Sequence, residues 1–579
     1  MILQEILFPE KDICEIIDLY YRGVFENNII KEGNTLKFNT YFNSFSIEKW
    51  IKYTSLTNLS IVLEVLGKGK INIVNAYYDK KKLIRKQLKS ISIDFSERKY
   101  KEIEIDNIGL KGIIYFEIEA EKDFKFFSGK YTCNISESET NNVDLAICIC
   151  TYKREKFVKR NVKILKDNII NKKESQLCNH LDVFVIDNAQ TLDRNDFEYE
   201  KIHYFNNKNV GGSGGFTRGI IEATFKSNKK ITHCILMDDD ITLSSSVIER
   251  TFSFLKILKK EFSKKMIGGA MLYQEQQYSQ GESGAEWINT KSKLRNSNYD
   301  LRNEELIILN ELDDININYN GWWYCCIPTT IITKNNLPLP LFIHMDDVEY
   351  GLRNKEGFIM LNGICVWHPN VENKGPITNY YYNYRNMLIM NSRYKKFKKT
   401  KLKIRLFGFM MYYLFQYKYS EIELGFKGCF DYFKGIDEFK KIDGEKLHKD
   451  LLKYNYKKEK NKINISSNQR NPKNVVVQIG ILIKGAIGCI MPKFLHNKVY
   501  TSNRATVTSC FAKKTAVYDV ENENIIYLKR DFKKMKKCFR EYNEICQIIN
   551  KRNDSITDEW NSRLEEITNL KFWNNYLGL

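Results

Sequence analysis

The sequence predicts a multidomain α/β protein in three parts: a β-rich sandwich or barrel over residues 1–140, an α/β domain over 141–392 and a helical region over 393–579. Three observations support this division. Apolar and polar residues alternate in the first part, continuous apolar runs separated by helical segments follow, and the last part is rich in lysine with helical spacing. A chain of 579 residues can bury several hydrophobic cores without disulfides or structural metals.

The N-terminal part shows the two-residue period of strands that bury one face. The segments LKFNTYF, SIVLEVLGKGKINIVNAYY and GIIYFEIEAE all alternate in this way. Gly67 and Gly69 interrupt the second segment, so we predict a hairpin turn there. Short strands separated by turns are typical of a β-sandwich or barrel.

The middle part contains three continuous apolar runs, in VDLAICICTYKRE, LDVFVIDNAQ and ITHCILMDDD. Strands that are apolar along their whole length are buried on both faces, which favours a parallel sheet covered by helices. Each run ends in polar residues. Because open α/β sheets bind ligands at the carboxyl ends of their strands, we expect the functional site at this edge.

The C-terminal part combines basic and apolar blocks. Residues 395–419 join a lysine-rich block to an apolar–aromatic block, which predicts either a peripheral membrane anchor or a solvated helix face. Val475 to Met491 is the most apolar segment, but Gln478 and Lys484 interrupt it, so we expect a buried or interfacial helix. The N-terminus shows no cleavable signal pattern.

Charge and cysteine content narrow the function class. The net charge of +20 fits a nucleic acid, an anionic membrane surface or a phosphorylated substrate, although an AT-rich genome can account for part of the lysine excess. The basic residues are dispersed and no RNA-recognition pattern occurs, so we expect no nucleic-acid partner. The 14 cysteines include no CxxC pair, which argues against a zinc ribbon and favours a reduced, cytoplasmic location.

An acidic triplet and a histidine are candidates for metal binding. Asp238, Asp239 and Asp240 directly follow the third apolar run, and carboxylates at alternate positions can share a hard divalent cation. Such a cation would neutralise a diphosphate leaving group. His368, at the end of the apolar run in GICVWHP, is a credible third ligand. The alternatives are a solvated acidic turn and a structural histidine.

The segment NNKNVGGSGGFTRG, residues 206–219, has four glycines within five residues. Glycine allows close backbone approach, so the N–H groups of this segment could cradle a phosphate. The segment is not a Walker A loop, because no GK[ST] follows. The alternative is a flexible loop without a ligand.

Two further pairs could serve a hydroxyl acceptor. Asp346 and Asp347, in PLPLFIHMDDVEYGLR, precede a predicted helix and could include a general base, or they could only cap that helix. Trp322 and Trp323, in NGWWYCCIP, could form a platform on which a sugar stacks, although at least one of them is expected in a core.

The order of these motifs resembles a known family of enzymes. CICTYKRE, NVGGSGGFTRG, MDDD, GWWYCCIP, FIHMDDVEYGLR and VWHP follow one another within residues 143–369. Together they resemble the inverting family 2 glycosyltransferases of the GT-A fold, a Rossmann-like mixed sheet. More narrowly, they resemble the bacterial galactofuranosyltransferases that polymerise cell-wall galactan. The β-rich and helical parts match that group only as architecture.

The resemblance implies roles for the acidic residues. Asp238, Asp240 and His368 would hold Mn²⁺ or Mg²⁺, Asp347 would be the catalytic base, and Asp346 would orient the acceptor.

The resemblance also implies a donor site and an acceptor site. The residues around the uridine diphosphate would be Thr151, Arg154, Asp187, Asn209, Gly212 and Asp239. Trp322 and Trp323 would line the acceptor site. The sequence departs from the group's pattern at Asn383, because that pattern has a histidine at this position.

The implied activity is the inverting, metal-dependent transfer of galactofuranose from a UDP-sugar to a glycan. The acceptor would be linked to a polyprenyl diphosphate at the inner face of the cell membrane, in the synthesis of cell-surface polysaccharide. The main alternative keeps the fold and uses another nucleotide sugar, such as dTDP-rhamnose. A non-catalytic glycan- or polyanion-binding protein is the alternative from another class, and the lysine-rich helices could mediate homo-oligomer formation.

Overall fold

The computed structural model describes residues 1–106, 109–288, 290–312, 316–370, 377–394, 398–460, 498–501, 515–519 and 524–579. They form two compact units. The first comprises Met1–Leu339, Asp347–Asn370 and Asn574–Leu579, and the second comprises Pro340–Asp346 and Val371–Trp573. The segment Val475 to Met491, for which we expect a buried or interfacial helix, lies outside the described residues.

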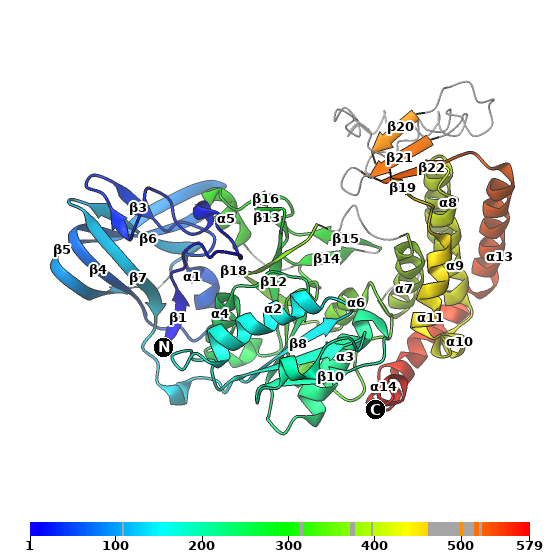
Figure 1. Ribbon diagram of the computed structural model, residues 1–579, viewed down its shortest axis with the longest axis horizontal. Helices are drawn as coiled ribbons and strands as arrows, with labels where there is room; N and C mark the ends of the chain where they lie inside the picture. Colours follow the sequence, from blue (N-terminus) through cyan, green and yellow to red (C-terminus); the bar gives the residue numbers. More distant parts are fainter. Residues whose placement is uncertain are drawn as a thin grey trace. The chain divides into compact units, whose positions relative to one another are not determined.

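The N-terminal part of the first unit is one seven-stranded antiparallel sheet (Figure 1). Its central strand, β4, pairs along one edge with β5, and along the other with β7 in its first half and β6 in its second half. The strands are β1 (Ile2–Glu5), β2 (Ile29–Ile30), β3 (Thr35–Lys37), β4 (Leu59–Asp79), β5 (Lys82–Ile105), β6 (Ile113–Ala120) and β7 (Phe124–Thr132). The predicted sandwich or barrel is therefore an antiparallel half-barrel.

The predicted turn at Gly67 and Gly69 is wrong, because both glycines lie inside β4. The chain turns instead at Lys80 and Lys81, which both have positive φ, as two-residue hairpins require. The glycines serve a close approach between strands. A Cβ at Gly69 would lie 2.3 Å from the carbonyl oxygen of Glu119, at the place where β4 changes partner from β7 to β6.

The α/β part is built on a nine-stranded mixed sheet with the order β10-β9-β8-β11-β17-β12-β13-β16, in which β18 also pairs with β12. The three apolar runs form the parallel neighbours β9, β8 and β11, as predicted. Strand β17 is antiparallel to β11, so the sheet is mixed. The strands are β8 (Leu145–Thr151), β9 (Leu181–Asp187), β10 (Ile202–Asn206), β11 (His233–Asp238), β12 (Met266–Tyr273), β13 (Gln276–Glu282), β16 (Tyr299–Asp300), β17 (Cys325–Pro328) and β18 (Phe358–His368).

Helices cover this sheet, and a two-stranded hairpin extends from it. The helices of the first unit are α1 (Ile47–Tyr53), α2 (Glu155–Leu165), α3 (Gly211–Ile221), α4 (Ser245–Lys256), α5 (Glu304–Asn310) and α6 (Asp346–Arg353). The hairpin consists of β14 (Ala285–Ile288) and β15 (Lys291–Leu294).

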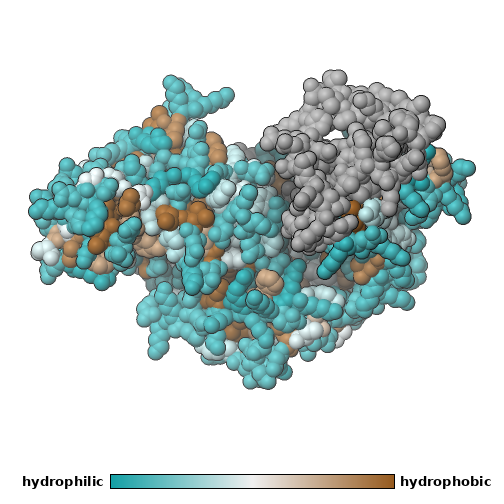
Figure 2. All heavy atoms as spheres, turned by 45° about the horizontal axis from the view of Figure 1, so that its top comes forward, coloured by the Kyte–Doolittle hydropathy of each residue, from teal (hydrophilic) through white to brown (hydrophobic). Residues whose placement is uncertain are grey.

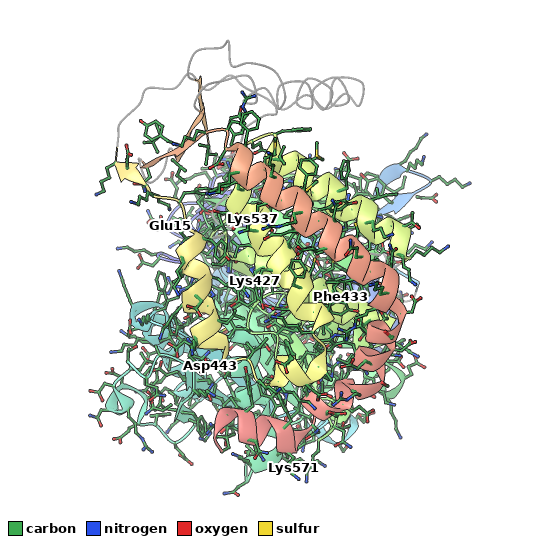
Figure 3. The ribbon with its side chains drawn as sticks, turned by 90° about the vertical axis from the view of Figure 1, so that its right-hand side faces the viewer. Glu15, Lys427, Phe433, Asp443, Lys537 and Lys571 are labelled. Carbon is green, nitrogen blue, oxygen red and sulfur yellow. The ribbon has the colours of Figure 1, made fainter. Side chains whose placement is uncertain are left out.

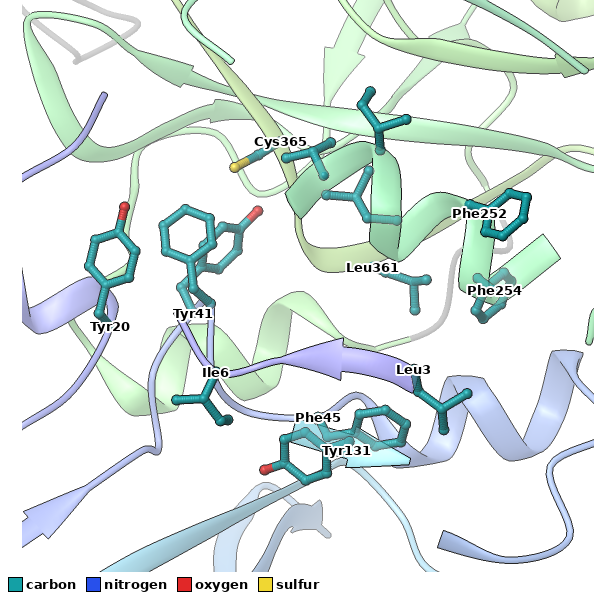
Figure 4. Packing of buried hydrophobic residues seen from close by; sticks show 14 of the residues in the cluster. Leu3, Ile6, Tyr20, Tyr41, Phe45, Tyr131, Phe252, Phe254, Leu361 and Cys365 are labelled. Carbon is teal, nitrogen blue, oxygen red and sulfur yellow. The ribbon is translucent and has the colours of Figure 1, made fainter. Parts of the chain in front are cut away.

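The two sheets of the first unit share one hydrophobic core. Figure 4 shows Phe45 and Tyr131 of the N-terminal part near Phe252 and Leu361 of the α/β part, and all four belong to the same buried cluster. This core spans the predicted domain boundary at residue 140, so the half-barrel packs directly against the α/β part.

The second unit is mainly helical, as predicted (Figure 3). Helix α13 packs against α9, and Trp560 of α13 stacks on Tyr432 of α9 with ring centroids 5.9 Å apart. The helices are α7 (Asn379–Tyr394), α8 (Lys399–Leu414), α9 (Tyr419–Phe433), α10 (Ile436–Lys440), α11 (Gly444–Leu451), α13 (Phe532–Arg563) and α14 (Leu570–Leu577), which ends in the first unit. Strands β19 (Glu459–Lys460), β20 (Lys498–Thr501), β21 (Thr515–Asp519) and β22 (Asn524–Leu528) form a small sheet.

The two compact units divide the chain differently from the three predicted domains, because the two sheets share a core and α7 packs with the later helices. The predicted domain limits stay predictions. Among the described residues, no helix is both long enough and apolar enough to cross a bilayer. The face in Figure 2 is largely hydrophilic outside the grey atoms, and its apolar patches are small and separate.

Candidate functional site

The carboxyl ends of four strands carry polar side chains. Thr151 ends β8, Asp187 ends β9, Asp238 ends β11 and His368 ends β18. Strands β9, β8 and β11 are parallel neighbours, so their ends meet at one edge of the sheet. This edge is where a ligand is expected in an open α/β sheet.

The structure brings the three predicted metal ligands together. Donor atoms of Asp238, Asp240 and His368 all lie within 4.8 Å of one another. The His368 Nε2 atom is 3.5 Å from Asp240 Oδ1 and 3.9 Å from Asp238 Oδ2. Two carboxylates and one imidazole can hold a divalent cation of the Mn²⁺ or Mg²⁺ kind.

A hydrogen bond orients the imidazole for this role. His368 Nδ1 lies 2.8 Å from the carbonyl oxygen of Pro369, which can only accept a hydrogen bond. Nδ1 therefore carries a proton, and Nε2, on the side of the carboxylates, is the ring nitrogen that could coordinate a cation. Metal-binding histidines commonly have this arrangement.

The pKa of Asp238 is raised to about 7, chiefly by burial; the charges of Asp240 and Asp239 also raise it, while His368 and Arg154 lower it. Without a cation, the cluster therefore retains a proton near neutral pH. A bound cation would replace that proton, since carboxylates coordinate in their ionised form.

Asp239 lies outside the cluster around His368 and shares Arg154 with Asp240. It is buried and accepts a hydrogen bond from Arg154 Nη1 at 3.0 Å, while the same nitrogen lies 2.6 Å from Asp240 Oδ2. Arg154 is otherwise half exposed, with a side-chain exposure of 49%. The guanidinium therefore lies at the mouth of the acidic cluster, where it can also face an incoming anion.

Sequence reasoning missed Asn161, which fixes the backbone of the acidic turn. This fully buried residue of α2 donates hydrogen bonds to the carbonyl oxygens of Asp239 (2.9 Å) and Ile241 (3.0 Å). The signal that could have revealed it is an asparagine on the apolar face of an amphipathic helix, between Val158 and Val162.

Asp187 organises a loop and does not present a free carboxylate to the site. The side chain is fully buried, and four backbone N–H groups donate to it. The donors belong to Ala189, Gln190, Thr191 and Leu192, at 2.8–2.9 Å. The carboxylate thus fixes the shape of the loop that follows β9, and its predicted contact with the nucleotide stays a prediction.

We expect the Asp187→Ala variant to lower the free energy of unfolding by about 3 kcal/mol or more, because each orphaned buried donor costs roughly 1–3 kcal/mol. The matched control is Asp193→Ala, which removes an exposed aspartate with a single backbone hydrogen bond, to Asn195 N, and should cost about 1 kcal/mol or less. Denaturation followed by tryptophan fluorescence measures both. Equal losses in the two variants would contradict the role of Asp187.

The glycine-rich segment is not a loop. It forms α3, which packs on β8. A Cβ at Gly215 would lie 2.1 Å from Cys150 Sγ, and one at Gly219 would lie 2.8 Å from Cys148 Cβ. These two glycines, four residues apart on one helix face, therefore allow the helix to contact the strand closely.

The predicted phosphate contacts lie at the beginning of α3. The side chain of Asn209 accepts a hydrogen bond from Gly211 N at 3.2 Å, and the place of a Cβ at Gly212 is open space. The first N–H groups of a helix lack partners within the helix, so this turn could face an anion.

The structure separates the two tryptophans. Trp322 is only 6% exposed and packs edge-on against Phe216 of α3 (5.3 Å) and Tyr350 of α6 (6.2 Å). Trp323 is half-buried, donates a hydrogen bond from Nε1 to Gly269 O, and has its ring 6.3 Å from that of His368. Of the two rings, that of Trp323 is therefore the more accessible, and the acceptor platform stays a prediction.

Asp346 and Asp347 are the first residues of α6, and both are half-buried. Burial raises the pKa of Asp347 to about 6, against the effect of hydrogen bonds from backbone N–H groups, including Val348 N at 2.7 Å. A carboxylate with this pKa is well suited to accept a proton near neutral pH. Asp347 therefore combines the position of a helix-capping residue with the chemistry of a base.

A second carboxylate, Glu282, lies in the same region. Burial raises the pKa of the Tyr319 phenol, and the charges of Glu282 and Asp347 add to that effect, so both carboxylates lie near this ring. Glu282 is buried at the end of β13. Sequence reasoning missed it because a single glutamate after a strand of mixed polarity carries no motif.

Comparisons with known proteins show that the chain is similar to galactofuranosyltransferases. Residues 7–134 match the family described as Galactofuranosyltransferase 2 N-terminal. The chain is 26% identical over 381 residues to Galactofuranosyltransferase GlfT2 of Mycobacterium tuberculosis, a match that covers 61% of this chain and 58% of the relative. It is 24% identical over 388 residues to Galactofuranosyltransferase GlfT2 of Mycolicibacterium smegmatis, with coverages of 61% and 57%.

The chain thus spans less than two thirds of the length of either relative. Among solved structures, the N-terminal endo-1,4-β-D-xylanase 10B modules of Clostridium thermocellum match at 9% identity and a TM-score of 0.17, over 32% of this chain and 38% of that one. A likeness of this size carries no argument about the fold.

Proposed function

We propose, on the premise that the chain is a distant homologue of the GlfT2 galactofuranosyltransferases, that it is an inverting glycosyltransferase of the GT-A fold that uses UDP-galactofuranose. The observation that carries the proposal is the cluster of Asp238, Asp240 and His368 at the carboxyl edge of the mixed sheet. A cation site at this edge suits a diphosphate leaving group, and the relatives' names supply the sugar.

In the proposed mechanism, Asp238, Asp240 and His368 would hold a divalent cation, whose positive charge would offset the negative charge of a diphosphate leaving group. Arg154, at the mouth of the cluster, adds a positive charge for the same diphosphate. The first turn of α3, at Gly212, offers backbone N–H groups to an anion.

The acceptor side of the mechanism uses Asp347. This carboxylate takes the proton from an acceptor hydroxyl as its oxygen forms a bond to the anomeric carbon, while the bond from that carbon to the diphosphate oxygen breaks. Attack from the face opposite the leaving group inverts the configuration. Trp323 offers an indole face against which the acceptor sugar can stack, and Asp346 orients the acceptor.

Nucleotide binding by the full chain tests the proposal directly. We expect UDP and UDP-galactofuranose to bind more tightly with Mn²⁺ than without it in a thermal-shift or saturation-transfer experiment, and dTDP-sugars to bind weakly. Preference for dTDP-rhamnose would keep the fold and the mechanism but overturn the donor. The absence of nucleotide binding under every metal condition would favour a non-catalytic glycan-binding protein.

The acceptor that we propose is a glycan linked to a polyprenyl diphosphate, so the protein would work at the inner face of the cell membrane. The outer face of α8 supports this location. Ile404, Phe407 and Tyr412 are 66%, 44% and 49% exposed on this helix, and Lys401 lies exposed on it as well. A helix with exposed apolar side chains beside basic residues is suited to the surface of an anionic membrane.

We therefore expect the protein to float with vesicles that contain an anionic lipid at low salt. The double variant Ile404→Asp and Phe407→Asp should reduce the bound fraction by about tenfold, because each exposed apolar side chain can contribute more than about 1 kcal/mol when it is buried in the membrane surface. The matched control is Leu452→Asp, at an exposed apolar side chain (43%) of the same unit that lies outside α8. Equal loss in the control, or no flotation of the wild type, would reject this surface.

A further inference from the structure

The segment that leads into α6 has an unusual backbone. Phe342, His344 and Met345 have φ values of 74°, 66° and 70°, in the left-handed region that non-glycine residues rarely occupy. Three such residues within four positions require the surrounding structure to hold them in place. The chain continues directly into Asp346 and Asp347 at the beginning of α6.

Two buried residues of α7 hold this segment. Asn386 Nδ2 donates to the carbonyl oxygens of Leu341 (3.2 Å), Ile343 (2.8 Å) and His344 (3.0 Å). Arg385 Nη2 donates to the same Leu341 oxygen at 2.8 Å. The amide of Asn386 thus lies at the centre of the turn, and its exposure is 0%.

A hydrogen bond to its oxygen fixes the orientation of the Asn386 side-chain amide. Its Oδ1 accepts a hydrogen bond from Arg385 Nε at 2.9 Å, so its NH₂ group must face the carbonyls. Arg385 also donates to the hydroxyl of Tyr381 (3.3 Å), which in turn donates to Asp431 of α9 (2.8 Å). The ring of Phe342 is held separately, since it stacks on Tyr382 with centroids 5.8 Å apart.

We infer that Asn386 is a positioning residue: by bonding the carbonyls of Leu341, Ile343 and His344 it keeps the three left-handed residues of this segment in place and so fixes where α6, and with it Asp347, begins. The inference rests on the proposed function in that Asp347 acts as the base. Asn386 itself is not expected to touch either substrate. Without its amide, the strained residues relax to ordinary φ values and the first turn of α6 shifts.

The test compares Asn386→Ala with Asn391→Ala in the full chain. Asn391 is the matched control, because it is likewise buried in α7 but, within the part of the chain that the structure describes, its side chain bonds only to Met387 O of its own helix. We expect Asn386→Ala to increase amide hydrogen exchange in residues 342–348 and to lower kcat by about 100-fold, since small misplacements of catalytic groups have effects of this size. The affinity for UDP with Mn²⁺ should stay unchanged in both variants.

A second substitution that restores the lost function would provide a further test. Glycine adopts positive φ at little cost, so adding Met345→Gly to Asn386→Ala should restore part of the lost kcat and of the exchange protection. If Asn386→Ala does not fold, Asn386→Asp takes its place, because it keeps the side-chain volume and removes both donors.

The outcomes distinguish a failure of the proposed function from a failure of the positioning role of Asn386. If the wild type transfers no sugar, the proposed function fails, and the exchange comparison still decides whether Asn386 holds the segment. If the wild type transfers sugar and Asn386→Ala matches Asn391→Ala in kcat, the positioning role is overturned. Unchanged exchange in residues 342–348 overturns the inference outright.

Discussion

Replacement of Asp240 by asparagine is expected to lower sugar transfer by about 1000-fold or more, because a bound cation contributes several kcal/mol to a transition state that develops negative charge. The asparagine keeps the size of the side chain but loses the charge that faces His368 Nε2 at 3.5 Å. The measurements are the rate of transfer and, independently of activity, the affinity for Mn²⁺ by titration calorimetry or electron paramagnetic resonance.

The matched control for this variant is Asp182→Asn. Asp182 also lies in the mixed sheet and also faces a histidine, His203 Nε2 at 3.0 Å, but it stands at the beginning of β9 and not at the carboxyl edge. We expect its Mn²⁺ affinity and transfer rate to match the wild type. An Asp240→Asn variant that binds Mn²⁺ as tightly as the wild type would remove Asp240 from the cation site.

The metal site should also respond to pH. Since the pKa of Asp238 lies at about 7 in the cation-free protein, protons compete with the cation below that pH. Mn²⁺ affinity is therefore expected to fall as the pH drops through 7 towards 6, with protons released to the buffer on binding.

The residues of the metal cluster could be predicted from the sequence for a physical reason. A polar residue directly after a fully apolar strand must lie at the end of a buried strand, and the ends of parallel neighbours share one edge. This argument located Asp238 and Asp240 correctly, and it suggested His368 after β18. The distances among these three side chains could not be predicted, because β18 is far from β11 in sequence and enters the sheet by pairing with β12.

The same argument did not predict the direction of the Asp187 carboxylate. It placed the residue correctly at the end of β9, but the direction of a carboxylate depends on the N–H groups of the loop that follows, which leave no pattern in the sequence. Asn161 shows the converse: it lies on a helix, away from every motif, and still fixes the turn that carries the acidic residues.

Two glycine-containing segments differ from the sequence prediction, because the low helix and strand propensities of glycine, each weaker than that of alanine by roughly 1 kcal/mol, predict loops. In α3 and β4, packing overrides this propensity. Gly215 and Gly219 give α3 its contact with β8, and Gly69 allows the backbone of β6 to approach β4 closely. Close approach of two backbones is a tertiary property, which a single sequence does not reveal.

Replacement of Asp347 by asparagine tests the base and should have the second large effect, a loss of transfer of about 100- to 10,000-fold, which is the range for removal of a general base. The affinity for UDP with Mn²⁺ should remain near the wild-type value, because the amide preserves the shape of the side chain and its place at the beginning of α6. The neighbouring variant Asp346→Asn is the control. It should raise the KM for the acceptor more than it lowers kcat.

The pH dependence of transfer gives an independent test of the same residue. Burial raises the pKa of Asp347 from its ordinary value to about 6, so the acid form persists up to that pH. Because only the ionised form accepts a proton, transfer at saturating Mn²⁺ should be lost as the pH falls through 6 and should level off above 7. The residual activity of Asp347→Asn should lack this acid limb, since asparagine does not titrate. If the variant retains the limb together with near wild-type rates, the base is another carboxylate, and Glu282, which lies near Tyr319 as Asp347 does, becomes the first residue to replace.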